Sequence, residues 1–121
     1  MKKLSCHCGE IEAEINISNL EKVIRCNCSI CKRKGVPMSF VKNEDFKIIK
    51  GEKKLTLYKF HSKIAKHYFC SICGIYTHHN PRINPLMTGF NLGCVDEIDS
   101  FKLDDQITVA DGRNHPLDKK K

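Results

Sequence analysis

The sequence predicts a mainly β fold in one small domain that is stapled by bound metal. Short runs rich in β-branched and aromatic residues recur along the chain between turn formers. The eight cysteines include closely spaced clusters that are typical of metal ligands. With 121 residues, the chain is long enough to bury one modest core, and in this size range a staple adds useful stability.

The expected strands follow one another along most of the chain. The clearest covers residues 11–17, where apolar residues from Ile11 to Ile17 alternate with polar ones in the period of a strand with one wet face. Similar runs follow at residues 36–41, 46–49, 55–60, 64–69, 74–79, 86–95 and 107–110. The runs at 55–60 and 64–69 are expected to pair as a hairpin.

The segments between these runs complete the expected organisation. The acidic residues 96–105 are expected to form one short helix or only turns. Gly89 and Gly93 indicate a bulge or close backbone packing within the 86–95 run. Because no change in composition marks a domain boundary, we expect a single domain over residues 1–121, with a core at about 4–113 and a polar tail at 114–121.

The composition favours a cytoplasmic protein with a basic surface. The N-terminus reaches polar residues before any apolar run of signal-peptide length, and no later run approaches the roughly 20 apolar residues of a membrane span. In a reducing compartment, clustered cysteines are expected to bind metal rather than form disulfides. The formal net charge of +7 raises nucleic acid as a partner, but the lysines are scattered, so we favour a solvated, solubilising surface.

Seven cysteines fall in three clusters, CHCG at residues 6–9, CNCSIC at 26–31 and CSICG at 70–74. Two cysteine pairs complete one tetrahedral site. The first and last clusters place Gly9 or Gly74 directly after their second cysteine, where a metal knuckle often needs a positive φ, whereas the middle cluster has Lys32 there. We therefore predict a closed structural site formed by Cys6, Cys8, Cys70 and Cys73.

The middle cluster is left as a second site with three ligands, Cys26, Cys28 and Cys31. Three protein ligands and an open fourth position are usual for catalytic zinc. Zinc suits thiolate ligands, and iron–sulfur ligation is the alternative that the spacing leaves open. Three thiolates make such a site negative. The basic residues expected to offset this charge, and to attract an anionic thiol substrate, are Lys32, Arg33 and Lys34.

Cys94 and the histidines have alternative interpretations. Cys94 is isolated in the 86–95 run and is expected to pack in the core; as a fourth ligand it would instead close the second site and make both sites structural. His7 is expected to point away from the metal at the surface. Since neighbouring residues of a strand face opposite sides, we expect one of His78 and His79 to be packed and the other solvated.

The ordered motifs CHCG, CNCSICKRKG, FCSICGIYTHHNPR, NLGCVDEID and ADGRNHP resemble the glutathione-dependent formaldehyde-activating enzyme family, which also includes centromere protein V. The resemblance implies a β fold of twisted antiparallel sheets, the β-tent, with two zinc sites at the two ligand sets already given. It also implies the condensation of glutathione with formaldehyde to S-hydroxymethylglutathione, classed with carbon–sulfur lyases. Whether the second zinc is retained is left open.

We therefore expect a zinc enzyme that binds glutathione, or another small thiol, and a formaldehyde-like carbonyl. Arg33 and Arg82 are the candidates for contacts to the tripeptide carboxylates, because arginine grips carboxylates bidentately. The alternative is a non-catalytic module with two structural zinc sites whose basic face binds nucleic acid or a protein. It predicts Cys94 or a histidine as fourth ligand. Three Tyr, six Phe and no Trp give a base-stacking surface little support.

Overall fold

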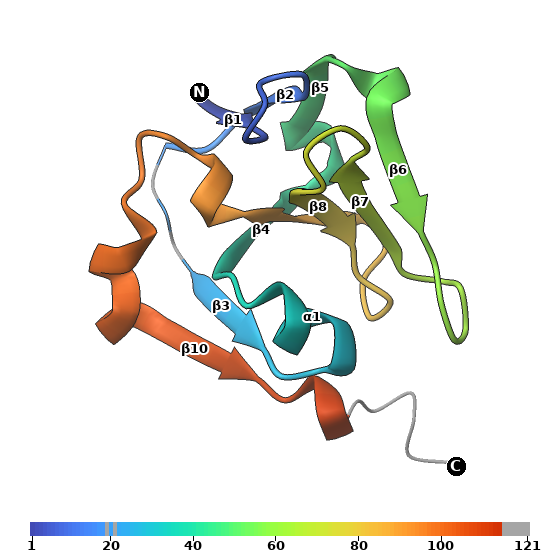
Figure 1. Ribbon diagram of the computed structural model, residues 1–121. Helices are drawn as coiled ribbons and strands as arrows, with labels where there is room; N and C mark the ends of the chain where they lie inside the picture. The colour runs from blue at the N-terminus through green and yellow to red at the C-terminus, as the bar shows by residue number, and fades with distance from the viewer. Residues whose placement is uncertain (19, 21, 115–121) are drawn as a thin grey trace.

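Two β-sheets make up most of the computed structural model, which describes residues 1–18, 20 and 22–114 (Figure 1). The smaller sheet has the order β1-β2-β5, with bounds Lys2–Ser5, Glu12–Ile15 and Phe46–Lys50. The larger sheet has seven strands in the order β10-β3-β4-β9-β8-β7-β6. Their bounds are Ile107–Ala110, Val23–Cys26, Met38–Lys42, Met87–Asn91, Tyr76–Asn80, Lys66–Cys70 and Leu55–Tyr58. The fold is mainly β, as the sequence predicts.

The strand pairs are antiparallel except at one edge of the larger sheet. β6 and β7 pair antiparallel, which confirms the hairpin predicted from residues 55–60 and 64–69. β10 instead runs parallel to β3, with Ala110 opposite Cys26. This pairing brings the end of the described chain beside the middle cysteine cluster. β3, β10 and the helix α1 (Ser29–Lys34) lie together, on the side of the molecule away from β1 and β2 (Figure 1).

The sequence does not predict β1, β3 or α1, all of which lie near the cysteine clusters. β1 has no apolar alternation of its own, and it forms because it pairs with the amphipathic β2. α1 occupies only six residues inside the middle cluster, too few for a helical period to be visible. It is fixed by its ends: the sulfur of Cys28 accepts a hydrogen bond from Cys31 N, and Gly35 ends the helix with a φ of 67°.

The strand expected at residues 86–95 is too long. β9 ends at Asn91, whose side-chain oxygen accepts a hydrogen bond from Gly93 N at 2.8 Å, and residues Leu92–Cys94 form a 3₁₀ turn. Cys94 therefore lies on a turn. The close packing expected at Gly89 is confirmed, because a Cβ there would lie 2.4 Å from the ring of His79.

The C-terminal part of the described chain consists of turns followed by β10. Residues Ser100–Gln106 form a 3₁₀ helix, so the segment 96–105, expected to form one short helix or only turns, contains a short helix of the 3₁₀ type. From residue 115 onward, the polar tail predicted at 114–121 lies outside the described residues. Within the part of the chain that the structure describes, no helix is long and apolar enough to cross a membrane.

The main core lies between the two sheets. Leu4, Ala13 and Ile15 from the smaller sheet pack with Val41 and Phe90 from the larger one. Ala13 and Ile15 are fully buried, and the residues between and before them in β2 are not, in agreement with the predicted period of two. Removal of this apolar surface from water is the main driving force that holds the two sheets together.

Both faces of β8 are covered, which makes the expectation of one solvated histidine wrong. His78 is 6 % exposed, and its ring stacks on Tyr68 with centroids 4.6 Å apart. His79 is 4 % exposed and meets the ring of Phe40 edge-on at 5.5 Å. The alternation of the strand holds, but the sheet has side chains packed on each side at this position, so both histidines are buried.

Candidate metal centres

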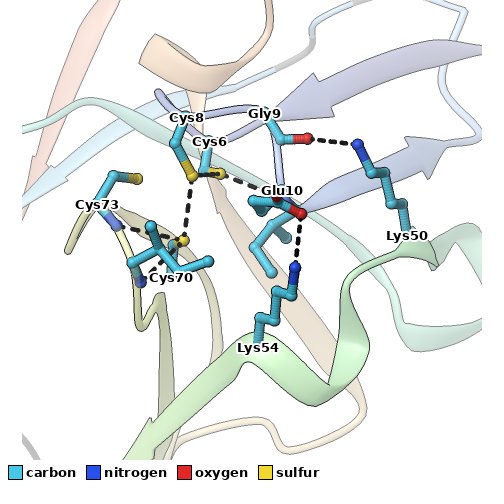
Figure 2. Close-up of polar contacts among 10 residues, drawn as sticks. Cys6, Cys8, Gly9, Glu10, Lys50, Lys54, Cys70 and Cys73 are labelled. Carbon is cyan, nitrogen blue, oxygen red and sulfur yellow. Dashed lines mark hydrogen bonds and ion pairs between the residues drawn. The ribbon is translucent and has the colours of Figure 1, made fainter.

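The first cysteine group combines two knuckles that are far apart in sequence. Cys6 and Cys8 follow β1, while Cys70 and Cys73 lie at the end of β7 and just after it. Their four sulfurs lie within 4.8 Å of one another, and Cys8 Sγ is 3.6 Å from Cys6 Sγ and 3.7 Å from Cys70 Sγ (Figure 2). Zinc–sulfur bonds of about 2.3 Å in a tetrahedron separate the sulfurs by about 3.8 Å. This group could hold a zinc ion.

Backbone N–H groups point at the sulfurs of both knuckles. Ile11 N and Ile72 N donate to the sulfur of the first cysteine in their own knuckle, at 3.3 and 3.4 Å. Gly9 and Gly74 have φ angles of 81° and 76°, which confirms the positive φ expected from the sequence. Such donors favour the thiolate form, which is the form that binds a metal ion.

The second cysteine group surrounds the start of α1. Cys26 ends β3, Cys28 caps the helix, and Cys31 lies within it. Their sulfurs lie within 4.8 Å of one another. Among residues 1–18, 20 and 22–114, no other Cys, His, Asp or Glu belongs to this group. It could therefore hold a metal ion with three protein ligands from the described chain.

The second group borders a pocket of about 860 Å³, within the range of about 300–1,000 Å³ that is typical of small-molecule sites. Apolar side chains form part of its wall, among them Ile24, Met38, Phe40 and Phe60. Polar side chains in the wall include His67, His79, Arg82 and Arg113. The first group does not line this pocket, so the two cysteine groups differ in what lies beside them.

Hydrogen bonds to Asn27 hold residues 111–113 beside the second cysteine group. Asn27 Nδ2 donates to Asp111 Oδ1 at 3.2 Å, and Arg113 N and Nε donate to the side-chain and backbone oxygens of Asn27, each at 3.0 Å. Between them, Gly112 lies so near that an added Cβ would be 2.5 Å from Cys26 Sγ. The absence of a side chain at Gly112 allows this backbone to approach the cysteine group.

Two hydrogen-bonded pairs join the pocket wall, which includes His67 and His79, to Lys34 and Tyr76, which line a separate depression. Lys34 Nζ is 2.8 Å from His67 Nδ1, and Tyr76 OH is 2.6 Å from His79 Nδ1. Lys34 Nζ also lies 3.6 Å from the centroid of the Tyr76 ring. His67 and His79 face each other across β7 and β8, with centroids 5.3 Å apart and ring planes 8° from parallel. The four side chains therefore form one contiguous polar cluster.

Burial sets the protonation of this cluster. Burial, assisted by the charge of Lys34, lowers the pKa of His67 to about 4 and the pKa of His79 well below the ordinary value of 6.5. It also lowers the pKa of Lys34 to about 8, against the opposing effect of the nearby cysteines, and raises the pKa of Tyr76 well above 10.0. At neutral pH both imidazoles are neutral, the phenol is protonated, and Lys34 is predominantly charged.

The basic residues that the sequence singles out lie in different places. Arg82 lines the pocket beside the second cysteine group. Arg33 is exposed, donates to Ser29 O at 2.7 Å, and lines a separate depression of about 460 Å³. Lys32 is exposed, whereas the charge of Lys34 interacts with the cysteines of the second group. Of the basic residues expected near the second group, Arg82 thus lies in the pocket wall, whereas Arg33 and Lys34 both line the separate depression, and Lys34 contacts the wall residue His67.

Cys94 packs in the core, as expected, and does not join the second group. It is 5 % exposed, packs in the cluster that contains Leu4 and Val95, and donates to Tyr76 O at 3.7 Å. Burial raises the pKa of its thiol to about 12, and the charges of the first cysteine group add to this effect. His7 is exposed in the turn between Cys6 and Cys8, as expected of a residue that points away from the sulfurs.

Sequence reasoning did not identify several residues of the pocket. Gly112 and Arg113 belong to the motif ADGRNHP, but nothing local indicates that β10 returns parallel to β3. His67 in the pocket wall, and Tyr76 in contact with the wall residue His79, are ordinary members of β-type runs by sequence. The one available signal is Gly112, two residues after the strand expected at 107–110, which is consistent with a close backbone approach.

Comparison with known proteins gives two findings. The family model described as glutathione-dependent formaldehyde-activating enzyme matches residues 1–111. A solved crystal structure of a Rhodobacter sphaeroides protein, a structural genomics target, is similar to this chain with a TM-score of 0.84 and 37% sequence identity. The similarity covers 89% of this chain and 99% of that one.

Proposed function

The chain belongs to the glutathione-dependent formaldehyde-activating enzyme family, and on this premise we propose that it is a zinc-dependent enzyme of the carbon–sulfur lyase type. It joins glutathione, or a related small thiol, to formaldehyde, or cleaves the adduct. The observation that carries this proposal is the second cysteine group, whose three sulfurs border a pocket of about 860 Å³. A metal held by three protein ligands next to a pocket is accessible to a substrate.

The donor sets fit zinc. The sulfur spacings of 3.6 and 3.7 Å in the first group support a tetrahedral thiolate site. The structural zinc would be held by Cys6, Cys8, Cys70 and Cys73. The second zinc would be held by Cys26, Cys28 and Cys31. When bound there, zinc would supply a lowered pKa for a substrate thiol, so that the thiolate is available at neutral pH.

The chain's own residues would bind the substrates and exclude water. Arg82 and Arg113 line the pocket and are suited to the two carboxylates of glutathione. The bond from Arg113 Nε to Asn27 O fixes the plane of that guanidinium. Arg33 is a weaker candidate because it lines the separate depression. In the reaction, the thiol releases its S–H proton to water, the sulfur bonds to the carbonyl carbon, the C=O π pair moves to oxygen, and that oxygen takes a proton back from water, so that no net proton is gained or lost.

Two further observations bear on this proposal. All eight cysteines are free, which supports a cytoplasmic location and metal binding in preference to disulfides. The non-catalytic alternative requires a fourth ligand that closes the second site. Cys94 packs in the core, and no histidine among the described residues joins the second group, so neither supports that alternative.

Cobalt substitution tests the accessible metal site. In the cobalt-loaded protein, we expect glutathione to change the ligand-field absorption bands, because its sulfur enters the coordination shell of the second metal. Oxidised glutathione, which has no thiol, serves as the control. Bands that stay unchanged with glutathione and with other small thiols would contradict the proposal.

A pair of cysteine variants separates the two sites. Cys28→Ser should abolish adduct formation and leave the fold largely intact, because serine also caps helices and the first group is untouched. Cys73→Ser should unfold the domain, because it opens the structural site. The two are compared by zinc content, circular dichroism and activity. An equal loss of stability in both variants would indicate that both sites are structural.

A further inference from the structure

His67 and His79 present two buried imidazoles to the pocket beside the second cysteine group. They are paired in register on β7 and β8, are 6 % and 4 % exposed, and both line the pocket. Polar rings buried in a wall lose the hydrogen bonds of water, so their placement is costly unless each nitrogen has a use. The proposed function, as stated so far, assigns these rings no role.

The partner of His67 fixes which of its nitrogens carries the proton. Lys34 Nζ is 2.8 Å from Nδ1 of His67. An ammonium group can only donate, so Nδ1 accepts, and the single proton of the neutral ring resides on Nε2. His67 therefore has a donor on the nitrogen that Lys34 does not contact.

The partner of His79 has the same effect. Tyr76 OH lies 2.6 Å from Nδ1 of His79. Bonds in which nitrogen donates to oxygen are typically about 2.9 Å long, whereas bonds from a hydroxyl donor are shorter, so the phenol is the donor. Nδ1 of His79 accepts, and its proton also resides on Nε2. Both rings, which are nearly parallel with centroids 5.3 Å apart, thus carry a donor on Nε2.

We propose that the Nε2–H groups of His67 and His79 together bind the carbonyl oxygen of the electrophile and stabilise the negative charge that develops there as the thiol sulfur attacks the carbon. The identity of the electrophile rests on the proposed function. The thiol gives its S–H proton to water; as the C–S bond forms, the C=O π pair moves to the oxygen that the two N–H groups bind, and this oxygen then takes a proton back from water. Lys34 and Tyr76 are positioning residues that hold the two rings in the donating tautomer.

The surroundings strengthen such donors. The wall around them includes the apolar rings of Phe40 and Phe60, which lower the local dielectric and increase the energy of each hydrogen bond to a developing charge. The cationic Lys34 behind His67 polarises that ring in the favourable direction. Loss of one preorganised donor of this kind typically lowers kcat by about 10²–10³-fold.

Paired substitutions test the role of the donors. His67→Leu and His79→Leu should each lower kcat for adduct formation by about 10²-fold in the zinc-loaded enzyme. The corresponding Gln variants should recover much of this loss, because the Gln amide N–H can replace Nε2–H. His78→Gln is the matched control: it removes a buried histidine whose ring packs on Tyr68 and does not line the pocket. Unchanged kcat in both Leu variants would overturn the proposal.

A binding experiment does not depend on activity. ¹⁵N NMR of the imidazoles in the zinc-loaded wild type should show His67 and His79 protonated on Nε2, and formate, a stable one-carbon probe, should shift both Nε2 signals. The inference would be overturned, even in an active enzyme, if the rings were protonated on Nδ1 or if formate left the Nε2 signals unshifted. If formate shifts both signals but glutathione and formaldehyde give no adduct, the proposed function is wrong, whereas the inference that His67 and His79 together bind an oxygen atom is supported.

Discussion

Gly112→Ala tests the close approach of the C-terminal backbone to the second cysteine group. The added Cβ would lie 2.5 Å from Cys26 Sγ and 2.7 Å from Cys28 Cβ. Separations this short cannot persist, and the atoms involved belong to two proposed ligands or to their supporting backbone. The substitution must displace either the sulfurs or the segment fastened to Asn27.

The expected magnitude follows from the cost of overpacking. Extra methyl groups in tightly packed sites cost about 1–3 kcal/mol. If that strain is relieved by loss of the second metal, the affinity of the second group for zinc should fall by about 5–150-fold, since about 1.4 kcal/mol corresponds to tenfold. The first group should be unaffected, because Gly112 is in contact with the second group.

Competition with a chromophoric zinc chelator measures this change in zinc affinity. The second cysteine group is expected to give the weaker of the two zinc-binding steps. Gly93→Ala is the control, because a Cβ there would meet only the side chain of Asn91, at 3.1 Å, away from both cysteine groups. Equal zinc affinity of the second group in wild type and Gly112→Ala would refute the reasoning. So would a loss confined to the first group.

Three further outcomes are expected. The free energy of unfolding should fall as the pH decreases from about 6.5 towards 4, and His78 should contribute up to about 1.4 kcal/mol per pH unit to this fall. Burial lowers the pKa of His78 to about 4, so the unfolded chain binds the proton at a higher pH than the folded one. In urea titrations, the free energy of unfolding of His78→Gln should depend less steeply on pH over this range. Tyr76→Phe should cost about 1–3 kcal/mol by the same measurement, because the Nδ1 of buried His79 loses its donor; an unchanged midpoint would contradict this. Arg82→Ala should weaken glutathione binding by about 10–150-fold in calorimetry, because one charge-assisted contact is lost. The matched Arg33→Ala should change the affinity little. A larger loss in Arg33→Ala than in Arg82→Ala would indicate that the carboxylates bind in the separate depression.

The parts of the fold that the sequence predicts are those encoded locally. The alternation in residues 11–17 identifies β2 because one face of that strand packs on the core and the other does not. Gly9 and Gly74 distinguish the first cysteine group because a left-handed backbone conformation is needed at those two positions. The two sets of sulfurs that lie together in the structure are the two sets that the sequence separates, and their metal ions are a proposal.

The parts that the sequence does not predict depend on tertiary pairing. β1 exists through its partner strand, and the burial of both His78 and His79 depends on what packs against each face of β8. The pocket depends on the parallel register of β10 on β3, which places Gly112 against a cluster more than eighty residues earlier. No local sequence pattern predicts which strand β10 pairs with or in which register.

That same register has a consequence for the order in which the protein matures during synthesis. The ribosome releases the N-terminal part of a chain first. All four sulfurs of the first group exist once residue 73 has been made, whereas β10 and Gly112 follow later in the sequence. The four ligands of the proposed structural metal site can therefore assemble before the second cysteine group receives the backbone that approaches it. Assembly of the proposed catalytic site therefore follows assembly of the proposed structural site during synthesis.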